Sequence, residues 1–355
     1  MRIDQKPLTQ IAATILHKAG AELERAQAVA EHLVIANLKG HDSHGVGMIP
    51  NYVKSMMSNL IHPQNDALLT RDSGAVLSFD GNLGFGRVVG IQAMEQGIAR
   101  AKSHGISCVA LGNAAHLGRI GAFAEHCAAA GLISTHYVNV VGHDPMVVAY
   151  GGRDRRFITN PFCCAVPRAD GNHVVLDMAT TTVAAGKVRV AYMKGEPVPE
   201  HSLVDRNGLE TTDASVIFSK DGGGAMQPFG LHKGYGLMVM CELLGGSLSG
   251  NGAAGPGPRD FANGMLSIYL TIDAFMEEDN FFAEDVKGYI DFVKSSTPAA
   301  GHTEVLLPGE PERARKAERL ANGVPIADIA WDSILQAAEK SGFSRADAIE
   351  MAGLA

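Results

Sequence analysis

A serine and a histidine stand side by side in the run Asp42-Ser43-His44-Gly45. Because imidazole titrates near neutral pH, a histidine in such a turn can donate a proton to a substrate oxygen or accept one from it. The neighbouring serine and glycine predict an exposed turn or a helix start, with hydroxyl and ring both available to a ligand. A structural interpretation stays open, in which Ser43 caps a helix that runs through Tyr52 and His44 is a surface histidine.

Other polar residues stand where chains commonly contact ligands. His116 follows a predicted strand and precedes Gly118 and a helix, which favours a ligand-contacting loop, although a lone histidine there can also be structural. The run from Asp177 to Val183 follows a buried strand, and its amides and threonine hydroxyls can hold an amide or a phosphate, or cap a helix. Lys233 can neutralise a phosphate or be an ordinary lysine at a helix start.

The run from Gly84 to Gly90, GFGRVVG, approximates the glycine fingerprint of dinucleotide-binding folds. Its spacing is one residue too long, and the second strand ends in Leu111-Gly112-Asn113, without a carboxylate for a ribose hydroxyl. We therefore interpret this run as a structural turn.

The formal net charge of −8 and the pI near 5.9 argue against nucleic acid as a partner, because binding phosphates needs a clustered positive surface. A small molecule is the expected partner. The basic cluster from Arg313 to Arg319 alternates with Glu312 and Glu318 at helical spacing, which predicts a solvated helix face.

The 5 cysteines show no Cys-x-x-Cys spacing, and the 14 histidines are scattered without metal-ligand spacing, so no metal site is expected. The polar N-terminus lacks an apolar signal core, and no stretch reaches the roughly 18 apolar residues that a membrane span requires. These features predict a cytoplasmic protein without a membrane partner.

Hydrophobic spacing predicts an α/β fold. Helices are expected over residues 7–38, broken near Gly20, and over 88–103, 120–130, 182–193 and 235–248, with strands at 76–79, 106–111, 133–140, 163–166 and 174–178. Leu266, Ile268, Leu270 and Ile272 alternate with polar residues, which predicts a half-buried strand; residues 250–258 form a glycine-rich loop, and the chain from Phe281 is mostly helical. Helices from both ends should pack together around a central mixed sheet, in three parts at 1–70, 71–280 and 281–355.

Five separated segments, in this order, resemble the malate/L-lactate dehydrogenase family of the non-Rossmann type. They are DSHGVGMIPNY, AAHLGRIGAFAEHCAAAGLIS, TNPFCCAVP, LDMATTTVAAGKV and LHKGYGLMVMCELL. The resemblance covers nearly the whole chain. It implies a mixed sheet with flanking helices, binding of NAD or NADP, and a homodimer with active sites between subunits or domains.

The resemblance also implies roles for single residues. His44 matches the proton donor or acceptor for the substrate oxygen, Ser43 lies beside it, and His116 matches a residue close to substrate and nicotinamide. The positions that match cofactor contacts are Thr159, Asn160, Pro161, Asp177, Met178, Ala179, Thr180, Thr181, Thr182, Val183, His232, Lys233, Gly309, Glu310 and Pro311.

Departures from the family pattern concern the substrate. Met48 stands where most relatives carry an arginine that can grip a carboxylate, and a thioether supplies no positive charge. Asn51 replaces a frequently basic residue, whereas Tyr52 keeps the usual aromatic. The stretch VVGHDPMVVAYGG, which contains His143, looks longer than is usual. We therefore expect Met48, Tyr52 and His143 to line an altered pocket whose acid is not plain malate or lactate.

The sequence thus favours an NAD(P)-dependent dehydrogenase acting on a 2-oxo/2-hydroxy acid. Reduction of a cyclic imino acid by the same family is the alternative, and a non-catalytic cofactor-binding protein that has lost its substrate anchor is a third. A hydrolase using Ser43 and His44 is disfavoured, because sequence neighbours do not ordinarily provide the nucleophile-to-base geometry.

Overall fold

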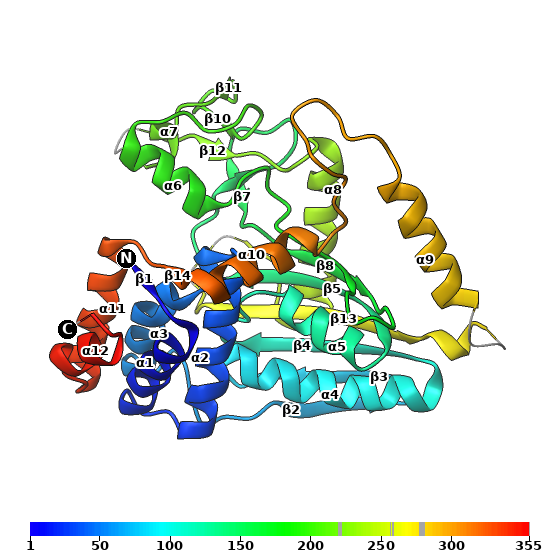
Figure 1. Cartoon of the computed structure of the whole chain (residues 1–355), viewed down its shortest axis with the longest axis horizontal. Coiled ribbons are helices and arrows are strands. Elements are labelled where there is room, and N and C mark those ends of the chain that lie inside the picture. Colours follow the sequence, from blue (N-terminus) through cyan, green and yellow to red (C-terminus); the bar gives the residue numbers. More distant parts are fainter. Residues whose placement is uncertain (219–221, 256, 258, 277–280, 355) are drawn as a thin grey trace.

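The computed structural model describes residues 1–218, 222–255, 257, 259–276 and 281–354 (Figure 1). It is a mixed α/β structure, which confirms the predicted fold class. The helices are α1 Gln5–Lys18, α2 Leu23–Leu38, α3 Ile49–Met57, α4 Gly86–His104, α5 Gly121–Ala129, α6 Ala185–Lys194, α7 Ser215–Phe218, α8 His232–Met240, α9 Phe281–Lys294, α10 Glu310–Asn322, α11 Asp328–Ser341 and α12 Arg345–Met351. The strands are β1 Arg2–Ile3, β2 Leu68–Ser73, β3 Val76–Asp80, β4 Ile106–Ala114, β5 Leu132–Val141, β6 Val147–Val148, β7 Arg155–Phe157, β8 Phe162–Val166, β9 Val174–Met178, β10 Leu203–Val204, β11 Glu210–Thr211, β12 Ala225–Met226, β13 Ala262–Thr271 and β14 Val324–Pro325.

The largest sheet has seven strands in the order β2-β3-β4-β13-β5-β8-β9. Strands β3 and β4 pair in parallel, as the predicted strand–helix–strand unit requires, and the other neighbours are antiparallel. Helices α4 and α5 cover one face (Figure 1), where Leu77, Val109 and Phe123 belong to one buried core. On the opposite face the helical segment Cys241–Ser247 packs against β5 and β13, where Glu242 accepts a hydrogen bond from Asn139.

The predicted strand near residue 270 exists, but its expected burial is wrong. β13 lies between β4 and β5 in the centre of the sheet, and α4 packs against it. The face of Ser267 and Tyr269, at 1% and 0% exposure, is the deeper one, whereas Ile268 and Leu270 are half-buried. Alternation marked the two faces correctly, but the face with Ser267 and Tyr269 is the more buried one because α4 packs on it, where a Cβ on Gly97 would lie 2.7 Å from the Tyr269 ring.

Helices from both ends of the chain pack together, as predicted. Residues from α1, α2 and α3 share one buried core with Trp331 and Ile334 of α11, and β1 pairs with β14. The break near Gly20 separates α1 from α2. Figure 1 shows the N- and C-termini on the same side of the molecule, beside these helices. The division at residues 70 and 280 stays a proposal.

A second, smaller sheet was not predicted from the sequence. It has five strands in the order β11-β10-β12-β6-β7 and packs with α6 and α7 around Val147, Val188, Leu203 and Met226. Its strands have two or three residues each, too few for an alternation pattern to be recognised. Figure 1 shows this part above the large sheet and the helices at the two ends of the chain.

The predicted helix over 235–248 begins earlier and changes its winding. α8 starts at His232, and after Met240 the segment η3, Cys241–Ser247, continues as a π-helix. Gly245 allows this segment to rest on the sheet, because a Cβ there would lie 2.6 Å from the carbonyl oxygen of Tyr137. Within the predicted loop at 250–258, residues 256 and 258 lie outside the described residues.

The prediction that the charged face of α10 is solvated is wrong at Arg319. Its side chain is 8% exposed, because this face of α10 packs against the end of α2, where Arg319 donates to the carbonyl oxygen of Asn37. Helical spacing of charges does not reveal which face a neighbour covers. No helix in the described ranges combines the length and the apolar character needed to cross a bilayer.

Candidate active site

The Asp42–Gly45 turn follows α2 as a short 3-10 segment, η1, Asp42–His44. The side chain of Asn37 brackets this turn: its Nδ2 donates to Asp42 Oδ1 at 2.7 Å, and its Oδ1 accepts from the backbone N–H of Val46 at 2.8 Å. Gly45 permits this close approach, because a Cβ there would lie 2.1 Å from Asn37 Oδ1. Asp42 before His44 and Gly45 after it are therefore both required for the contact of this turn with Asn37.

The turn brings His44 against His116. Their rings are nearly parallel, with centroids 5.5 Å apart. Ser43 Oγ is hydrogen-bonded to His44 Nδ1 at 3.0 Å, and Tyr52 Oη to His116 Nδ1 at 2.8 Å. Phe261, from the segment leading into β13, lies 6.3 Å from the His116 ring. The structure therefore unites the predicted residues Ser43, His44, His116 and Tyr52.

Burial sets the protonation of this pair. It lowers the pKa of His44, against the opposing charge of Asp177, and lowers the pKa of His116 to about 3, with a further contribution from His44. Burial also raises the pKa of Tyr52, so its hydroxyl keeps its proton. Both imidazoles are therefore neutral at neutral pH.

Two capping interpretations are wrong. Ser43 does not cap the following helix: α3 begins at Ile49, the described residues give it no side-chain cap, and Ser43 bonds the ring of His44 instead. The run from Asp177 to Val183 does not cap α6, which begins at Ala185 and likewise has no side-chain cap among the described residues.

The three threonine hydroxyls of that run donate to backbone carbonyl oxygens. These bonds go from Thr180 to Thr159 and Asn160, from Thr181 to Val183, and from Thr182 to His201 and Pro228, at 2.9 to 3.3 Å. They tie the run to the Thr159-Asn160-Pro161 turn and to the smaller sheet. The structure thus joins two of the predicted cofactor segments. The three hydroxyl protons are already donated to backbone carbonyl oxygens of the protein.

Asn160 is fully buried at the centre of this junction, with a φ of 33°. Its Nδ2 donates to Glu242 Oε1 at 2.6 Å, and Glu242 also accepts from Asn139 and from the backbone of Ala254. Its Oδ1 is buried and has no hydrogen-bond partner within the described residues. Sequence reasoning missed Glu242, although a glutamate in the middle of an apolar helix was a signal for a buried partner.

Asp177 is engaged in a charged cluster that sequence reasoning also missed. Arg119, 2% exposed, donates to Asp177 at 3.3 Å and to Glu125 at 2.5 Å, and Lys39 contacts Glu125 at 2.5 Å. Neighbouring charges lower the pKa of Glu125 despite its burial. Arg119 stands in the recognised segment AAHLGRIGAFAEHC, but only folding showed that it meets Asp177.

The predicted turn Gly309-Glu310-Pro311 opens α10 and lies on β9. Gly309 has a φ of 92°, and Glu310 accepts from Lys294 Nζ and from the backbone of Leu307. The backbone N–H of Val175 donates to the carbonyl of Pro308 at 3.1 Å. This turn is therefore fixed beside the strand that carries Asp177 and Met178.

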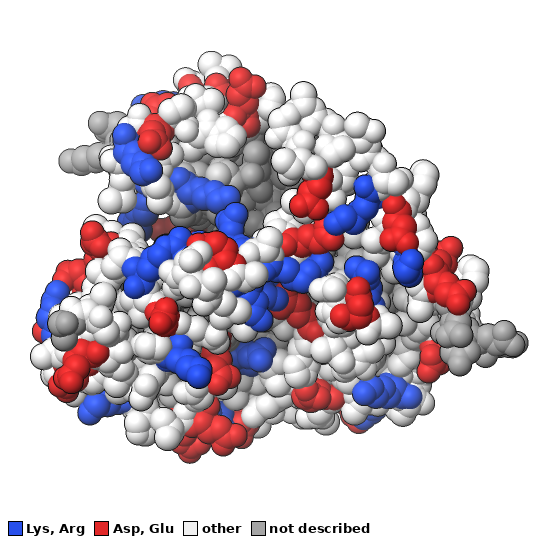
Figure 2. All heavy atoms as spheres, in the orientation of Figure 1, with Lys and Arg blue, Asp and Glu red and all other residues white. Residues whose placement is uncertain are grey.

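The two remaining predicted cofactor residues, His232 and Lys233, are exposed at the first turn of α8. The His232 ring lies 5.8 Å from the ring of Tyr150. Figure 2 shows a hollow between the part that carries α6 and the part that carries α10, with Lys and Arg side chains gathered along it.

The early turn and the late segments meet. A Cβ on Gly186, in the first turn of α6, would lie 3.6 Å from Ser43 Cβ, and His41 Nε2 lies 3.8 Å from Glu312 of α10. In contrast, the Gly84–Gly90 turn is filled by its own chain: a Cβ on Gly86 would lie 2.3 Å from the carbonyl oxygen of His116. This close packing supports the structural interpretation of the glycine run.

His143 lies outside the imidazole pair, on the rim of a cavity of about 750 Å³. The cavity is also lined by Arg155, Arg156 and Arg259. A Cβ on Gly142, which lines this cavity, would lie 2.3 Å from the carbonyl oxygen of Asp260, the residue before Phe261, whose ring centroid lies 6.3 Å from that of His116. Met48 packs partly buried against the helical core, so its side chain belongs to that core.

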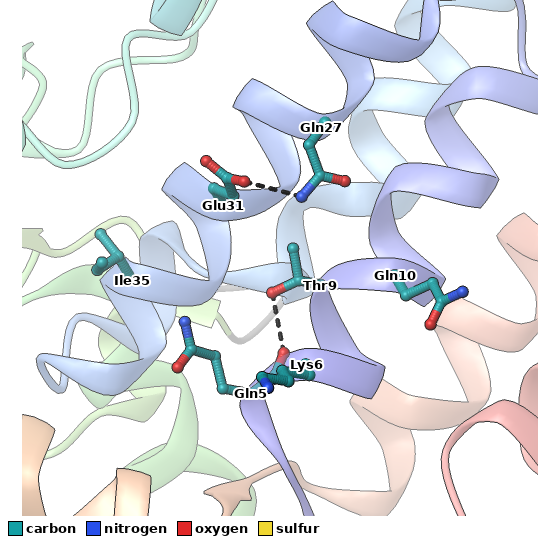
Figure 3. Close-up of a pocket in the computed structure, with 7 residues that line it drawn as sticks. All are labelled: Gln5, Lys6, Thr9, Gln10, Gln27, Glu31 and Ile35. Carbon is teal, nitrogen blue, oxygen red and sulfur yellow. Dashed lines mark hydrogen bonds between the residues drawn. The ribbon is translucent and has the colours of Figure 1, made fainter.

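A second hollow, of about 540 Å³, lies between α1 and α2 and contains none of the predicted site residues (Figure 3). Gln27 donates to Glu31, and Thr9 to the carbonyl of Gln5, so two of its polar side chains are hydrogen-bonded within their own helices. It is a groove between two helices rather than a candidate site.

Comparison with known proteins agrees with this geometry. The family described as malate/L-lactate dehydrogenase matches residues 3–335. The chain belongs to this family. Within it, hydroxycarboxylate dehydrogenase B of Escherichia coli strain K12 is 41% identical over 346 residues, 96% of this chain and 94% of that protein. L-lactate dehydrogenase of Cupriavidus necator is 39% identical over 322 residues, 90% of this chain and 92% of that protein. A solved E. coli structure of the malate/lactate dehydrogenase type superposes with a TM-score of 0.93 at 39% identity, over 99% of each chain.

Membership in the malate/L-lactate dehydrogenase family confirms the recognition made from the five sequence segments. It also confirms that the protein is an oxidoreductase of the dehydrogenase class.

Proposed function

We propose that this dehydrogenase transfers a hydride between NAD or NADP and a 2-oxo/2-hydroxy acid or a related small carbonyl compound. The observation that carries the proposal is the pair of stacked imidazoles, His44 and His116, 5.5 Å apart and beside the segment of Gly186. The names of two similar relatives, a hydroxycarboxylate dehydrogenase and an L-lactate dehydrogenase, support an acid with a hydroxyl group.

The nicotinamide, when bound, supplies or takes the hydride. His44 handles the proton: its neutral ring accepts the hydroxyl proton when an alcohol is oxidised, and the protonated ring returns it to the carbonyl oxygen in reduction. Ser43 holds Nδ1 of this ring, which leaves Nε2 for the substrate. The Tyr52 hydroxyl is hydrogen-bonded to His116 Nδ1 at 2.8 Å, which leaves Nε2 of that ring for a contact with the substrate.

The residues present fit a nicotinamide dinucleotide. The basic side chains along the hollow of Figure 2 and the exposed Lys233 at the start of α8 suit its phosphates. The buried Oδ1 of Asn160, which has no partner in the described ranges, suits a carboxamide or hydroxyl donor. We therefore propose Thr159–Pro161, Asp177–Val183, His232–Lys233 and Gly309–Pro311 as the cofactor-holding segments.

The substrate carboxylate needs an anchor other than residue 48. We propose that the cavity around His143 provides it, because Arg155 donates only to the carbonyl oxygens of Gly224 and Ile217 in the described structure, and a guanidinium can pair with a carboxylate. Arg259 adds a second guanidinium on the same cavity. An anchor displaced toward this cavity favours an acid larger than malate or lactate.

A substrate panel tests the function. Purified enzyme is mixed with NADH or NADPH and with 2-oxo acids, cyclic imino acids and uncharged carbonyls, and the loss of the reduced-nicotinamide absorbance is followed. We expect the highest kcat/KM with a 2-oxo acid other than oxaloacetate or pyruvate. Best activity on the malate couple defeats the altered pocket, best activity on imino acids selects the C=N alternative, and binding without turnover selects a non-catalytic protein.

The variant His44→Ala tests the assigned proton carrier. It should lose turnover by about 100-fold or more while reduced cofactor still binds with unchanged affinity, as measured by nicotinamide fluorescence. Normal turnover by this variant would remove His44 from the mechanism.

We propose that a second copy covers the face of the large sheet opposite α4 and α5. One row of paired residues crosses six strands on that face: Val76, Cys108, Ile268, Thr135, Cys164 and Leu176. A second row contains Ile106, Leu270 and Ile133. Both rows are uncharged and partly exposed, and a twofold axis would bring the same face of two copies together. This supports the homodimer that the family resemblance implies.

We also propose a cytoplasmic location. All five cysteines are free thiols, and burial raises the pKa of Cys127 and of Cys241 to about 12, so both stay protonated. A chain with free thiols suits a reducing compartment.

A further inference from the structure

We propose that Arg319 is a positioning residue for His44: from the last turns of α10 it fixes the Asp42–Gly45 turn and thereby the catalytic imidazole. The inference rests on the proposed function, in which His44 carries the proton. It gives a role to a residue that the sequence placed on a solvated helix face.

Arg319 binds Asp42, the first residue of the turn, through both terminal nitrogens of its guanidinium. Nη1 donates to Asp42 Oδ1 at 2.6 Å and Nη2 to Asp42 Oδ2 at 3.1 Å. Nη1 also donates to the carbonyl oxygen of Asn37, near the end of α2. A bidentate pair fixes direction as well as distance, because two parallel N–H···O bonds exclude rotation of the carboxylate.

Asn37 completes the clamp from the other side of His44. Its amide donates to the same Asp42 carboxylate, and its oxygen accepts from the N–H of Val46. The turn is thus held before and after Ser43 and His44. Among the described hydrogen bonds, those of the Asp42 side chain come from Asn37 and Arg319, so removal of Arg319 leaves one anchor of two.

Helix α10 extends this clamp to the predicted cofactor turn. Gly309–Pro311 lies at its beginning, and Arg319 lies about three turns later, roughly 13–15 Å along the axis at 1.5 Å per residue. Between them Glu312 approaches His41, and Arg313 donates to the carbonyl of His173 at 2.9 Å. One rigid helix therefore sets the position of the proton carrier relative to the cofactor-binding strand β9.

Precise placement matters more here than stability. The Asp42 carboxylate is about half exposed, so its ion pair with Arg319 adds little to folding. A displacement of a catalytic group by about 1 Å can cost about 100-fold in rate. Arg319 should therefore affect turnover far more than unfolding.

The test compares Arg319→Met, Arg319→Lys and Asp42→Asn with a control on the same helix, Glu318→Gln. Glu318 pairs with Arg2 at 2.9 Å and does not touch the turn. The measurements are kcat and KM with the best acid of the panel, binding of reduced cofactor by fluorescence, and the unfolding midpoint in urea.

We expect Arg319→Met to lower kcat by about 100-fold, with cofactor affinity changed less than about 3-fold and unfolding remaining cooperative. Arg319→Lys should retain part of the rate, since lysine supplies the charge without the fork. The double variant Asp42→Asn with Arg319→Met should be no slower than the slower single variant, because the two substitutions remove the same contact between Asp42 and Arg319. Glu318→Gln should keep the wild-type kcat. If Arg319→Met does not fold, Asp42→Asn, which keeps the shape of the side chain, decides in its place.

A second readout is independent of turnover. Histidine ring resonances of the complete protein, assigned with the help of His44→Ala, should shift for His44 in Arg319→Met and stay unchanged in Glu318→Gln. Unchanged His44 resonances, or a kcat loss that the control shares, would overturn the positioning role. Failure of the proposed function shows itself differently: the wild type would turn over no compound of the panel, while the resonance comparison still decides the role of Arg319.

Discussion

Stability should fall on mild acidification because of histidines that are buried in the neutral form. His136 in β5 is fully buried between Ser134 and Ser267, whose hydroxyls lie 3.0 Å and 2.8 Å from its two ring nitrogens. Burial lowers its pKa to about 3, against an ordinary value of about 6.5 in the unfolded chain. Between these two values the unfolded chain binds one proton more than the folded protein, so stability decreases as pH falls.

The size of this effect follows from the two pKa values. Between pH 8 and pH 5, one histidine with this shift removes about 2 kcal/mol from the free energy of unfolding, at 1.36 kcal/mol per pH unit below about 6.5. Burial lowers the pKa of His116 to the same value, and His32 is lowered as well. The wild-type protein should therefore lose at least about 4 kcal/mol over this range.

The variant His136→Gln isolates one of these contributions. It should be less stable than the wild type at pH 8. The difference in the free energy of unfolding should be about 2 kcal/mol smaller at pH 5, because only the wild type loses stability through this histidine. Urea unfolding at fixed protein concentration and at several pH values measures this. Ser134→Ala is the matched control: it removes a hydrogen bond of about 1 kcal/mol but no titrating group, so its deficit should be similar at both pH values. A deficit of His136→Gln that does not change with pH would refute the reasoning.

Two further predictions concern the site and the subunit contact. Tyr52→Phe removes the hydroxyl bonded to the buried His116 ring, so kcat/KM should fall about 10- to 100-fold in steady-state assays, and an unchanged value would show that the ring needs no such partner. Ile268→Glu places a charge at the centre of the uncharged sheet face and should convert a dimer into a monomer in light scattering after size exclusion, whereas Leu209→Glu, in an exposed turn of the smaller part, should not. A dimer that survives Ile268→Glu would place the contact elsewhere.

Several features could be read from the chain because they depend on short-range patterns. The break between α1 and α2 follows from apolar spacing on both sides of Gly20, and the parallel pair β3 and β4 follows from a strand–helix–strand order. The five recognised segments identified the malate/L-lactate dehydrogenase family. Each motif alone is ambiguous, but five motifs in the same order are specific. The sequence also marked Ser43, His44 and His116 as candidates for chemistry, although it left structural interpretations of each open.

Only the tertiary structure decided which distant residues meet, because contacts between remote segments leave no periodic trace in the chain. It placed Arg319 on Asp42, Arg119 on Asp177 and Glu242 on Asn160, three polar pairs that join segments far apart in the sequence. It also turned β13 so that Tyr269 is its most deeply buried side chain. Local spacing determines which residues share a face, whereas the packing of whole elements determines what that face touches.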